Sequence, residues 1–311
     1  MLITINANAA VDRLIFIPEF RPETVIRIPS AINYVGGKGF DTSVALSGIG
    51  APNLAMGFVA GDQDGKLLVS LLEKYGIQHN IEWVEGVTRI AYVIVEQNFN
   101  RHTHIITNGC TIPDQAAQNF LPRYRANLHP DDWVIASGSL AVGLPFDFYN
   151  QIIEIAHQTG AKVLIDTSDQ TARQTISSQP DILKMNRDEF RVTFGESAED
   201  IHELTGLACS QVERYQFPAL VLTLGDKGIL AVTPVGNYYA YCPKQKSVNA
   251  AGAGDAASAA LAWRFSQKES WKEALRWAAA VSAACVLTEG TAEVRLNDVH
   301  ELLPVAIVEQ I

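Results

Sequence analysis

Short apolar runs rich in β-branched residues alternate with segments of helical periodicity along most of the chain, and this alternation restricts the fold more than any other feature. The runs at 132–138, 161–167 and 219–225 have the length and composition of buried parallel strands. Apolar residues at helical spacing occupy segments between them, for example at 145–160 and 186–195. Such strand–helix–strand units predict an α/β fold with a doubly wound, mostly parallel sheet that is flanked by helices.

Two segments, residues 13–35 and 88–107, depart from this rhythm because their apolar residues alternate with period 2. Both are predicted to form half-buried antiparallel strands. Since each segment leaves the α/β body and returns to it, we expect the two to build one small β-sheet that acts as a lid or as a dimer contact. From about residue 255 the pattern becomes all-helical. No repeat or long linker divides the chain, so residues 1–311 are expected to form a single domain.

Composition and charge exclude several classes of protein. Hydrophobic residues make up 48% of the chain and charged residues 19%, so the chain can bury a large core and is not a disordered protein. The net charge of −10 argues against nucleic acids and membranes as partners, since both are polyanionic surfaces. The four cysteines are scattered, the first residues lack a signal-peptide pattern, and the longest nearly apolar stretch, 277–287, is too short to span a bilayer. We therefore expect a soluble cytoplasmic protein.

The sequence NAAGAGDAASAALAW at residues 249–263 is the strongest chemical signal. Gly252, Ala253 and Gly254 leave room for an anion to approach backbone N–H groups, and the helix predicted to start at Asp255 adds partial positive charge. A carboxylate at that helix start can take a proton from an attacking hydroxyl group. The pattern by itself also fits an ordinary glycine-rich turn in which Asp255 caps the helix.

A second glycine-rich loop, VGGKGFDTSVALSGIGA at residues 35–51, leads into another helix of small residues. It brings backbone N–H groups and the ammonium of Lys38 together, as an anion site requires. Lys38 is followed by Gly39 rather than by Ser or Thr, so the loop differs from the phosphate-binding loop that holds magnesium through a hydroxyl group. Alone, the pattern also fits a solvated loop lysine.

These two motifs belong to an ordered series that resembles the PfkB, or ribokinase-like, family of carbohydrate kinases, and within it the phosphosugar kinases. The series covers nearly the whole chain. In chain order it comprises NAAVD ending at Asp12, GGKG at 36–39, Thr88–Arg89, SGSLAVG at 137–143, IDTS at 165–168, KMNRDE at 184–189, LGDKG at 224–228 and GAGD ending at Asp255. The resemblance implies a ribokinase-like fold, with ATP and Mg²⁺ as cofactors.

The resemblance also implies a catalytic set. Asp255 resembles the general base that accepts the proton of a sugar CH₂OH group, and the N–H groups of Gly252–Gly254 would form the anion hole for the moving phosphoryl group. Asn186 and Glu189 resemble the element that orients Mg²⁺, through water, although without the rest of the series this pair also fits a helix cap. The residues that the resemblance assigns to the nucleotide are Asn186, Thr223, Gly225, Gly228, Val248, Gly252 and Gly254.

The sugar side of the predicted site lies mainly in the first half of the chain. Asp12 is expected to bind substrate hydroxyl groups, and Lys38 and Arg89 an existing phosphate. The full substrate-binding set is Asp12, Gly37, Lys38, Asp41, Arg89 and Ser139. Asp41 departs from the family pattern, which usually has Asn at this position after GGKG. Its charge would repel a phosphate, but it would accept hydrogen bonds from sugar hydroxyl groups.

Together these features predict an ATP- and Mg²⁺-dependent kinase that phosphorylates a hydroxymethyl group of a ketohexose phosphate. Fructose 1-phosphate is the first expectation, and tagatose 6-phosphate and fructose 6-phosphate come next. Asp41 leaves open a kinase for an unphosphorylated sugar or a nucleoside. A degenerate kinase that only senses a sugar is a further alternative, which the retention of Asp255, Asn186 and Glu189 opposes. A homodimer through the lid is expected because open sheet edges pair with partners.

Overall fold

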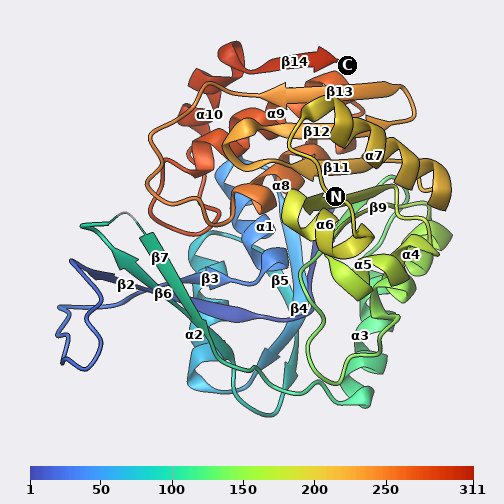
Figure 1. The fold of residues 1–311 in the computed structure, drawn as a ribbon. Coiled ribbons are helices and arrows are strands. Elements are labelled where there is room, and N and C mark those ends of the chain that lie inside the picture. The colour runs from blue at the N-terminus through green and yellow to red at the C-terminus, as the bar shows by residue number, and fades with distance from the viewer. Residues whose placement is uncertain (100) are drawn as a thin grey trace.

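The computed structural model describes residues 1–99 and 101–311, which form two β-sheets and the helices around them (Figure 1). The strands of the larger sheet are β1 (Leu2–Asn6), β4 (Asn53–Ala60), β5 (Gln78–Val84), β8 (Trp133–Ser137), β9 (Lys162–Asp166), β10 (Ile182–Asn186), β11 (Leu220–Thr223), β12 (Ile229–Thr233), β13 (Gly236–Tyr241) and β14 (Ile307–Gln310). They are ordered β14-β13-β12-β11-β10-β9-β8-β1-β4-β5. Neighbouring strands run parallel from β5 to β11 and antiparallel from β11 to β14. The predicted mostly parallel, doubly wound sheet is therefore confirmed.

Helices cover both faces of this sheet. They are α1 (Lys38–Gly48), α2 (Gln63–Lys74), α3 (Asp114–Ala126), α4 (Phe148–Thr159), α5 (Asp169–Ile176), α6 (Arg187–Phe194), α7 (Ile201–Tyr215), α8 (Ala253–Ser266), α9 (Trp271–Cys285) and α10 (Leu296–Leu302), with short 3₁₀ turns at Gly225–Lys227 and Leu303–Val305. Side chains of α3 to α7 share one core with the sheet, and those of α1, α8, α9 and α10 share the core on the other face. No helix in the described part of the chain is long and apolar enough to cross a membrane.

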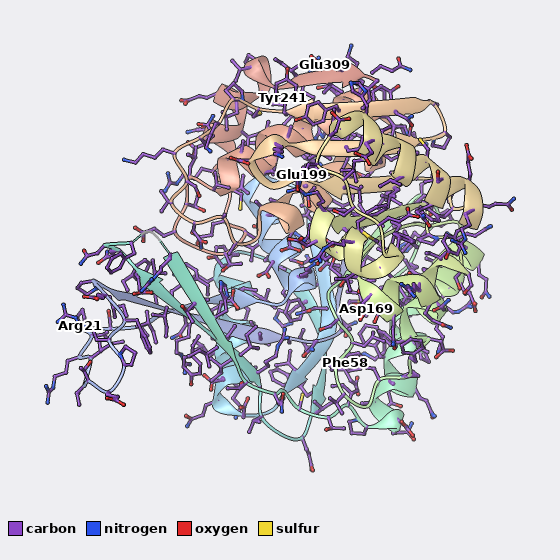
Figure 2. All side chains as sticks on the ribbon, in the orientation of Figure 1. Arg21, Phe58, Asp169, Glu199, Tyr241 and Glu309 are labelled. Atoms are coloured by element: carbon purple, nitrogen blue, oxygen red, sulfur yellow. The ribbon has the colours of Figure 1, made fainter. Side chains whose placement is uncertain are left out.

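Local sequence explains where individual helices begin and end. Asp62 caps α2, where its side chain accepts a hydrogen bond from Gly65 N at 2.8 Å, and Gly76 follows the helix with a φ of +69°. On the face covered by α3 and α4, Phe58 of β4 meets Phe120 at a centroid distance of 4.7 Å and Phe148 at 5.7 Å, inside the body of the protein (Figure 2).

The smaller sheet has the strands β2 (Ala10–Ile17), β3 (Ile32–Gly36), β6 (Arg89–Glu96) and β7 (Arg101–Ile106), in the order β3-β2-β6-β7. It projects from one side of the body as the predicted lid, and Arg21 lies on the loop at its outer end (Figures 1 and 2). β2 begins at Ala10, before the predicted boundary at residue 13. The expectation of purely antiparallel strands is wrong, because β2 and β6 pair in parallel. Each segment forms its own antiparallel hairpin, and the two hairpins join through their first strands.

The expectation that the chain is all-helical from about residue 255 is also wrong. β14 adds a final strand to the edge of the larger sheet by pairing with β13. Its residues, Ile307–Gln310, are mostly exposed and show no long apolar run, so the sequence lacks the signal of a buried strand.

Candidate active site

A cavity of about 590 Å³ opens where β9, β10 and β11 end. The last residues of these strands, Asp166, Asn186 and Thr223, line it on one side. Ala253–Asp255 at the start of α8, together with Ala279, Ser282 and Ala283 of α9, line it on the other. Ligands of open α/β sheets bind at the carboxyl ends of the strands, and the volume is sufficient for a nucleotide.

Most of the residues predicted to bind a nucleotide meet in this cavity. The lining includes Asn186, Thr223, Gly225, Gly228 and Gly254. Gly228 has a φ of +111°, and a Cβ there would lie 2.3 Å from the carbonyl oxygen of Ala240, so this turn requires glycine. Val248 is not among the residues that line the cavity, and it is 51% exposed. Gly252 lies behind the lining residues as the N-cap of α8.

Asp255 lies in the first turn of α8 and is only 7% exposed. Its Oδ1 has no hydrogen-bond partner among the described residues. Burial and the negative charge of Asp166 raise the pKa of the Asp255 carboxyl to about 7. A carboxylate of this pKa on a residue that lines a cavity can accept a proton near neutral pH.

The backbone beside Asp255 has the geometry of an anion site. Gly252 adopts a φ of +82°, and a Cβ at this position would lie 2.3 Å from Ala292 N. α8 begins at Ala253, whose N–H donates to Ala250 O at 3.4 Å, and the next N–H groups of a helix start have no partner within the helix. The ammonium of Lys184 lies against the same loop, 3.4 Å from where a Cβ of Gly254 would stand. Free N–H groups and a nearby cation can together stabilise a phosphoryl group.

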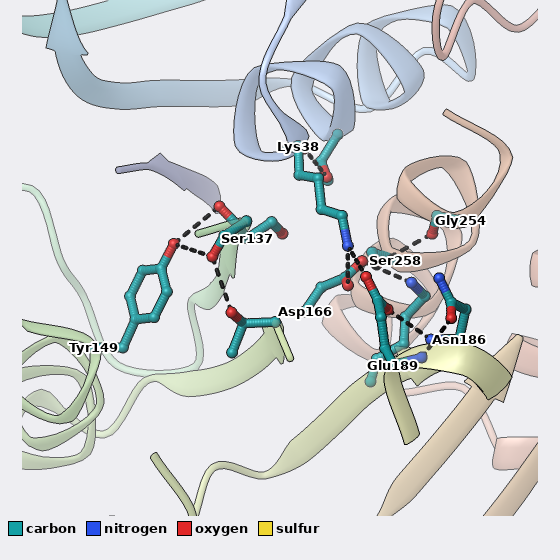
Figure 3. Close-up of polar contacts among 12 residues, drawn as sticks. Lys38, Ser137, Tyr149, Asp166, Asn186, Glu189, Gly254 and Ser258 are labelled. Atoms are coloured by element: carbon teal, nitrogen blue, oxygen red, sulfur yellow. Dashed lines mark hydrogen bonds and ion pairs between the residues drawn. The ribbon is translucent and has the colours of Figure 1, made fainter. Parts of the chain in front are cut away.

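Lys38 and Lys184 share the carboxylate of Asp166, and Figure 3 shows how Lys38 reaches it. Lys184 Nζ donates to Asp166 Oδ2 at 2.6 Å, and Ser258 Oγ donates to the same oxygen at 3.1 Å. Lys38 Nζ donates to Asp166 Oδ1 at 3.3 Å and to Glu189 Oε1 at 2.8 Å. Burial alone would raise the pKa of Asp166, but the two ammonium groups outweigh it and lower this pKa to about 2. Asp166 is therefore ionised at all working pH values.

Asn186 and Glu189, the predicted magnesium pair, form a capping box at the start of α6. Asn186 Oδ1 accepts from Glu189 N at 2.8 Å, and Glu189 Oε2 accepts from Asn186 N at 2.7 Å. Among residues 1–99 and 101–311, no cluster of three or more His, Cys, Asp or Glu side chains could hold a metal ion. Glu189 lines the cavity, however, and Mg²⁺ usually keeps several waters and binds phosphate oxygens. The pair therefore fits a water-mediated contact with Mg²⁺ better than direct ligation.

The sugar-side carboxyl groups lie under the lid. Asp12 of β2 accepts a hydrogen bond at Oδ2 from Thr291 Oγ1 at 2.9 Å, and burial raises its pKa to about 6. Asp41 of α1 is 5% exposed and its Oδ1 has no partner among the described residues. Burial, followed by the charges of Asp12 and Asp255, raises the pKa of Asp41 well above its usual range. Arg89 of β6 opposes this through its positive charge.

Asn8 connects the remaining predicted sugar-side residues. Its carbonyl oxygen accepts from Arg89 Nη2 at 2.8 Å, and its side-chain amide donates to Ser139 Oγ at 3.3 Å. Gly37, the N-cap of α1, adopts a φ of +97°, and a Cβ there would lie 3.1 Å from Asn8 O. Lys38, in contrast, contacts the carboxylates of the nucleotide cavity. Arg89 thus bonds to a sugar-side residue, whereas Lys38 bonds to the carboxylates of the nucleotide cavity and acts on Asp41 only through its charge.

Three residues that the sequence prediction left without a role now have one in the geometry. Asp166 and Lys184 form a buried ion pair in the lining of the cavity. Asn8 links the sugar-side residues. All three lie inside motifs of the ordered series, namely IDTS, KMNRDE and NAAVD. Their motif positions were the available signal, but only the contacts show what the side chains do.

The fold and the two adjoining sites define a phosphoryl-transferring carbohydrate kinase. The model of the pfkB family carbohydrate kinases matches residues 2–297. The chain belongs to this family, and it is accordingly a phosphotransferase that uses ATP and an alcohol group as acceptor.

Known proteins of similar sequence and structure agree with this assignment. The chain is 30% identical over 306 residues to the 1-phosphofructokinase of Bacillus subtilis, covering 98% of each chain. A possible 1-phosphofructokinase of Thermotoga maritima is 25% identical, with a TM-score of 0.88 and coverage of 100% of this chain and 99% of that one. Ribokinase of Arabidopsis thaliana, solved with ribose and ATP, has a TM-score of 0.79 at 21% identity over 97% of this chain and 98% of its own. The last likeness shows that the fold is ribokinase-like.

Proposed function

We propose that the chain transfers the γ-phosphoryl group of ATP to a hydroxymethyl group of a ketohexose phosphate, with fructose 1-phosphate as the first candidate. Tagatose 6-phosphate and fructose 6-phosphate are the next candidates. The single observation that carries the proposal is Asp255, a buried carboxyl group with an unpartnered oxygen and a pKa of about 7 at the start of α8. The similarity to a 1-phosphofructokinase over 98% of the chain supports the choice of sugar.

Each part of the proposed reaction has a group suited to it. Asp255 takes the proton of the sugar hydroxymethyl group, while the N–H groups of Gly252–Gly254 stabilise the charge on the moving phosphoryl group. Lys38 and Lys184 add positive charge beside that loop. Mg²⁺, when bound, neutralises the phosphate oxygens of ATP. Glu189 would hold it through water, and the glycine-rich turn at 225–228, which lines the same cavity, would contact the nucleotide.

The sugar is proposed to lie between Asp12, Asp41 and Arg89, under the lid. Asp12 accepts hydrogen bonds from hydroxyl groups, and Arg89 pairs with the existing phosphate. Burial and the charges of Asp12 and Asp255 raise the pKa of Asp41, which favours its protonated form and reduces its repulsion of this phosphate. A protonated carboxyl group donates and accepts hydrogen bonds, as the amide of asparagine does.

A substrate panel tests the choice of acceptor. The purified chain is mixed with ATP, Mg²⁺ and fructose 1-phosphate, tagatose 6-phosphate, fructose 6-phosphate, ribose or adenosine, and ADP release is measured. We expect the highest kcat/KM with fructose 1-phosphate. Turnover of only ribose or adenosine would show that the acceptor is an unphosphorylated sugar or nucleoside. This is the alternative that Asp41 leaves open.

Arg89→Ala tests the phosphate contact. Loss of a charge-assisted contact is expected to raise the KM of the sugar phosphate at least about tenfold, with the KM of ATP within about twofold. The matched control is Arg101→Ala, which removes a lid arginine that is 60% exposed and paired with Glu96. An equal effect of both substitutions would contradict a specific role for Arg89.

The lid is also proposed to join two copies of the chain. Ile105 and Ile106 of its edge strand β7 are 51% and 56% exposed. Pairing of this edge with a second copy would cover them. Light scattering of the purified protein decides between a dimer and a monomer. The single-domain organisation and the cytoplasmic location remain predictions from the sequence.

A further inference from the structure

The segment that joins α9 to α10 contacts both substrate sites. Residues 286–293 form neither helix nor strand, and we call them the bridge segment. Its own fold is held by Thr288, whose hydroxyl lies within hydrogen-bond distance of the carbonyl oxygens of Cys285 at 2.8 Å and Glu293 at 3.0 Å and can donate to either. Thr288 is 2% exposed, so this core of the bridge segment is buried.

On one side, the bridge segment holds the loop that leads into the anion hole. Val286 O accepts hydrogen bonds from Val248 N at 2.7 Å and Asn249 N at 3.3 Å. The side-chain amide of Asn249 donates to Glu289 O at 2.9 Å. Ala292 N donates to Ala251 O at 3.3 Å. These four bonds fix the chain immediately before Gly252 to the bridge segment.

The contact between Gly252 and Ala292 is particularly close. A Cβ on Gly252 would stand 2.3 Å from Ala292 N, so the two backbones touch. Ala292 has a φ of +55°, a left-handed conformation that non-glycine residues adopt at an energetic cost. Any shift of the bridge segment at this point would therefore move the anion hole.

On the other side, the same segment reaches the sugar site. Thr291, the residue before Ala292, donates from Oγ1 to Asp12 Oδ2 at 2.9 Å. Thr291 is 5% exposed, and it lies 279 residues from Asp12 in the sequence. One peptide unit thus separates the sugar-side contact from the contact with the anion hole.

We propose that Thr291 is a positioning residue, which fixes the carboxylate of Asp12 relative to the anion hole at Gly252 and so couples the binding of the sugar to the geometry of phosphoryl transfer. The inference rests on the proposed role of Asp12 in sugar binding. It adds a residue outside the ordered motif series, on a segment that the sequence left without a function.

The hydrogen bond also affects the titration of Asp12. Burial raises its pKa to about 6, while the Thr291 hydroxyl and the charge of Arg89 act to lower it. Asp41 of α1 also interacts with Asp12 through its charge. Loss of the hydroxyl group is therefore expected to raise the pKa of Asp12. As the pH falls, Asp12 then becomes protonated at a higher pH than in the natural chain, and sugar binding weakens with that protonation.

Thr291→Val removes the hydroxyl group and keeps the side-chain shape. With the sugar that the natural chain phosphorylates best, we expect kcat/KM to fall about 10–100-fold, mainly through KM, because a hydrogen bond to a charged group is lost. The acid limb of kcat/KM for the sugar should move to higher pH. The acid limb of kcat, which reports Asp255, should stay in place.

Three further variants separate positioning from simple destabilisation. Thr291→Ser retains the hydroxyl group and should restore kcat/KM to within about threefold. In a double-mutant cycle with Asp12→Asn, the effect of Thr291→Val should largely disappear. Thr175→Val removes an equally buried hydroxyl group on α5, where it donates only to Ala172 O, and should leave the kinetics unchanged. Thr291→Ala replaces the valine variant if the latter does not fold.

The outcomes are distinct from those of the substrate panel. The panel on the natural chain decides the proposed function, and the variants decide the role of Thr291 with whichever sugar is phosphorylated. An unchanged acid limb, a serine variant as poor as the valine variant, or effects of Asp12→Asn and Thr291→Val that simply add would each overturn the proposal.

Discussion

Replacing Asp255 by asparagine should lower activity and raise stability at the same time. The substitution keeps the shape of the side chain but removes the group that accepts the proton. Loss of a general base typically costs at least about 100-fold in kcat, or about 3 kcal/mol in the activation barrier. The opposite effect on stability follows from burial, because Asp255 is 7% exposed and carries a raised pKa.

The size of the stability effect follows from the pKa of Asp255. It rises from 3.8 to about 7 in the native state. Between these values the native chain holds a proton that the unfolded chain has lost, so the stability of the natural chain falls as the pH rises through this window. One pKa unit corresponds to about 1.4 kcal/mol, and ionisation therefore costs roughly 4 kcal/mol at pH 8. At pH 5 the cost is only about 2 kcal/mol, because the native carboxyl group is still protonated.

Urea unfolding at pH 8 and pH 5, together with kcat from ADP release, measures both effects. We expect Asp255→Asn to be more stable than the natural chain at pH 8, with a smaller gain at pH 5. Asp181→Asn is the matched control, since hydrogen bonds and the Lys162 ammonium outweigh burial and lower the pKa of Asp181. That variant should be less stable at pH 8 and retain kcat. Near-normal kcat in Asp255→Asn would refute its role as base, and an equal stability gain at both pH values would refute the raised pKa.

Three other substitutions give further expected outcomes. Lys184→Met leaves the carboxylate of Asp166 buried without its nearest cation, and should lower the free energy of unfolding in urea by about 3 kcal/mol; a loss below about 1 kcal/mol would contradict this. Burial and the charges of Asp12 and Asp255 raise the pKa of Asp41, so Asp41→Asn should abolish the rise in the sugar KM that ionisation of Asp41 causes in the natural chain as the pH increases; an equal rise in both chains would contradict this. Gly252→Ala places a Cβ against Ala292 and should reduce kcat at least about tenfold in the ADP-release assay, whereas unchanged kcat would show that the anion hole tolerates a shift.

Much of the fold could be predicted from the sequence because its determinants are local. The apolar runs that became β8, β9 and β11 and the helical spacing in α4 and α6 are each contained in a short stretch of chain. The glycine-rich loops at Gly37 and Gly252 were also visible, since the residues that shape each loop are consecutive. Contiguous signals of this kind sufficed for the α/β class, the lid segments and the kinase family.

Only the tertiary structure decided how distant segments meet. The parallel pairing of β2 with β6 and the antiparallel edge that ends in β14 depend on neighbours far away in the chain. The same holds for side chains. Lys38 meets Asp166 rather than a sugar-side residue, and Thr291 meets Asp12 across 279 positions. Burial and the charges of such neighbours set the pKa values of Asp12 and Asp255, and neither quantity can be read from spacing along the chain. The sequence by itself therefore determined the fold class and the kinase family, and the folded chain determined which distant side chains meet and how their surroundings shift their pKa values.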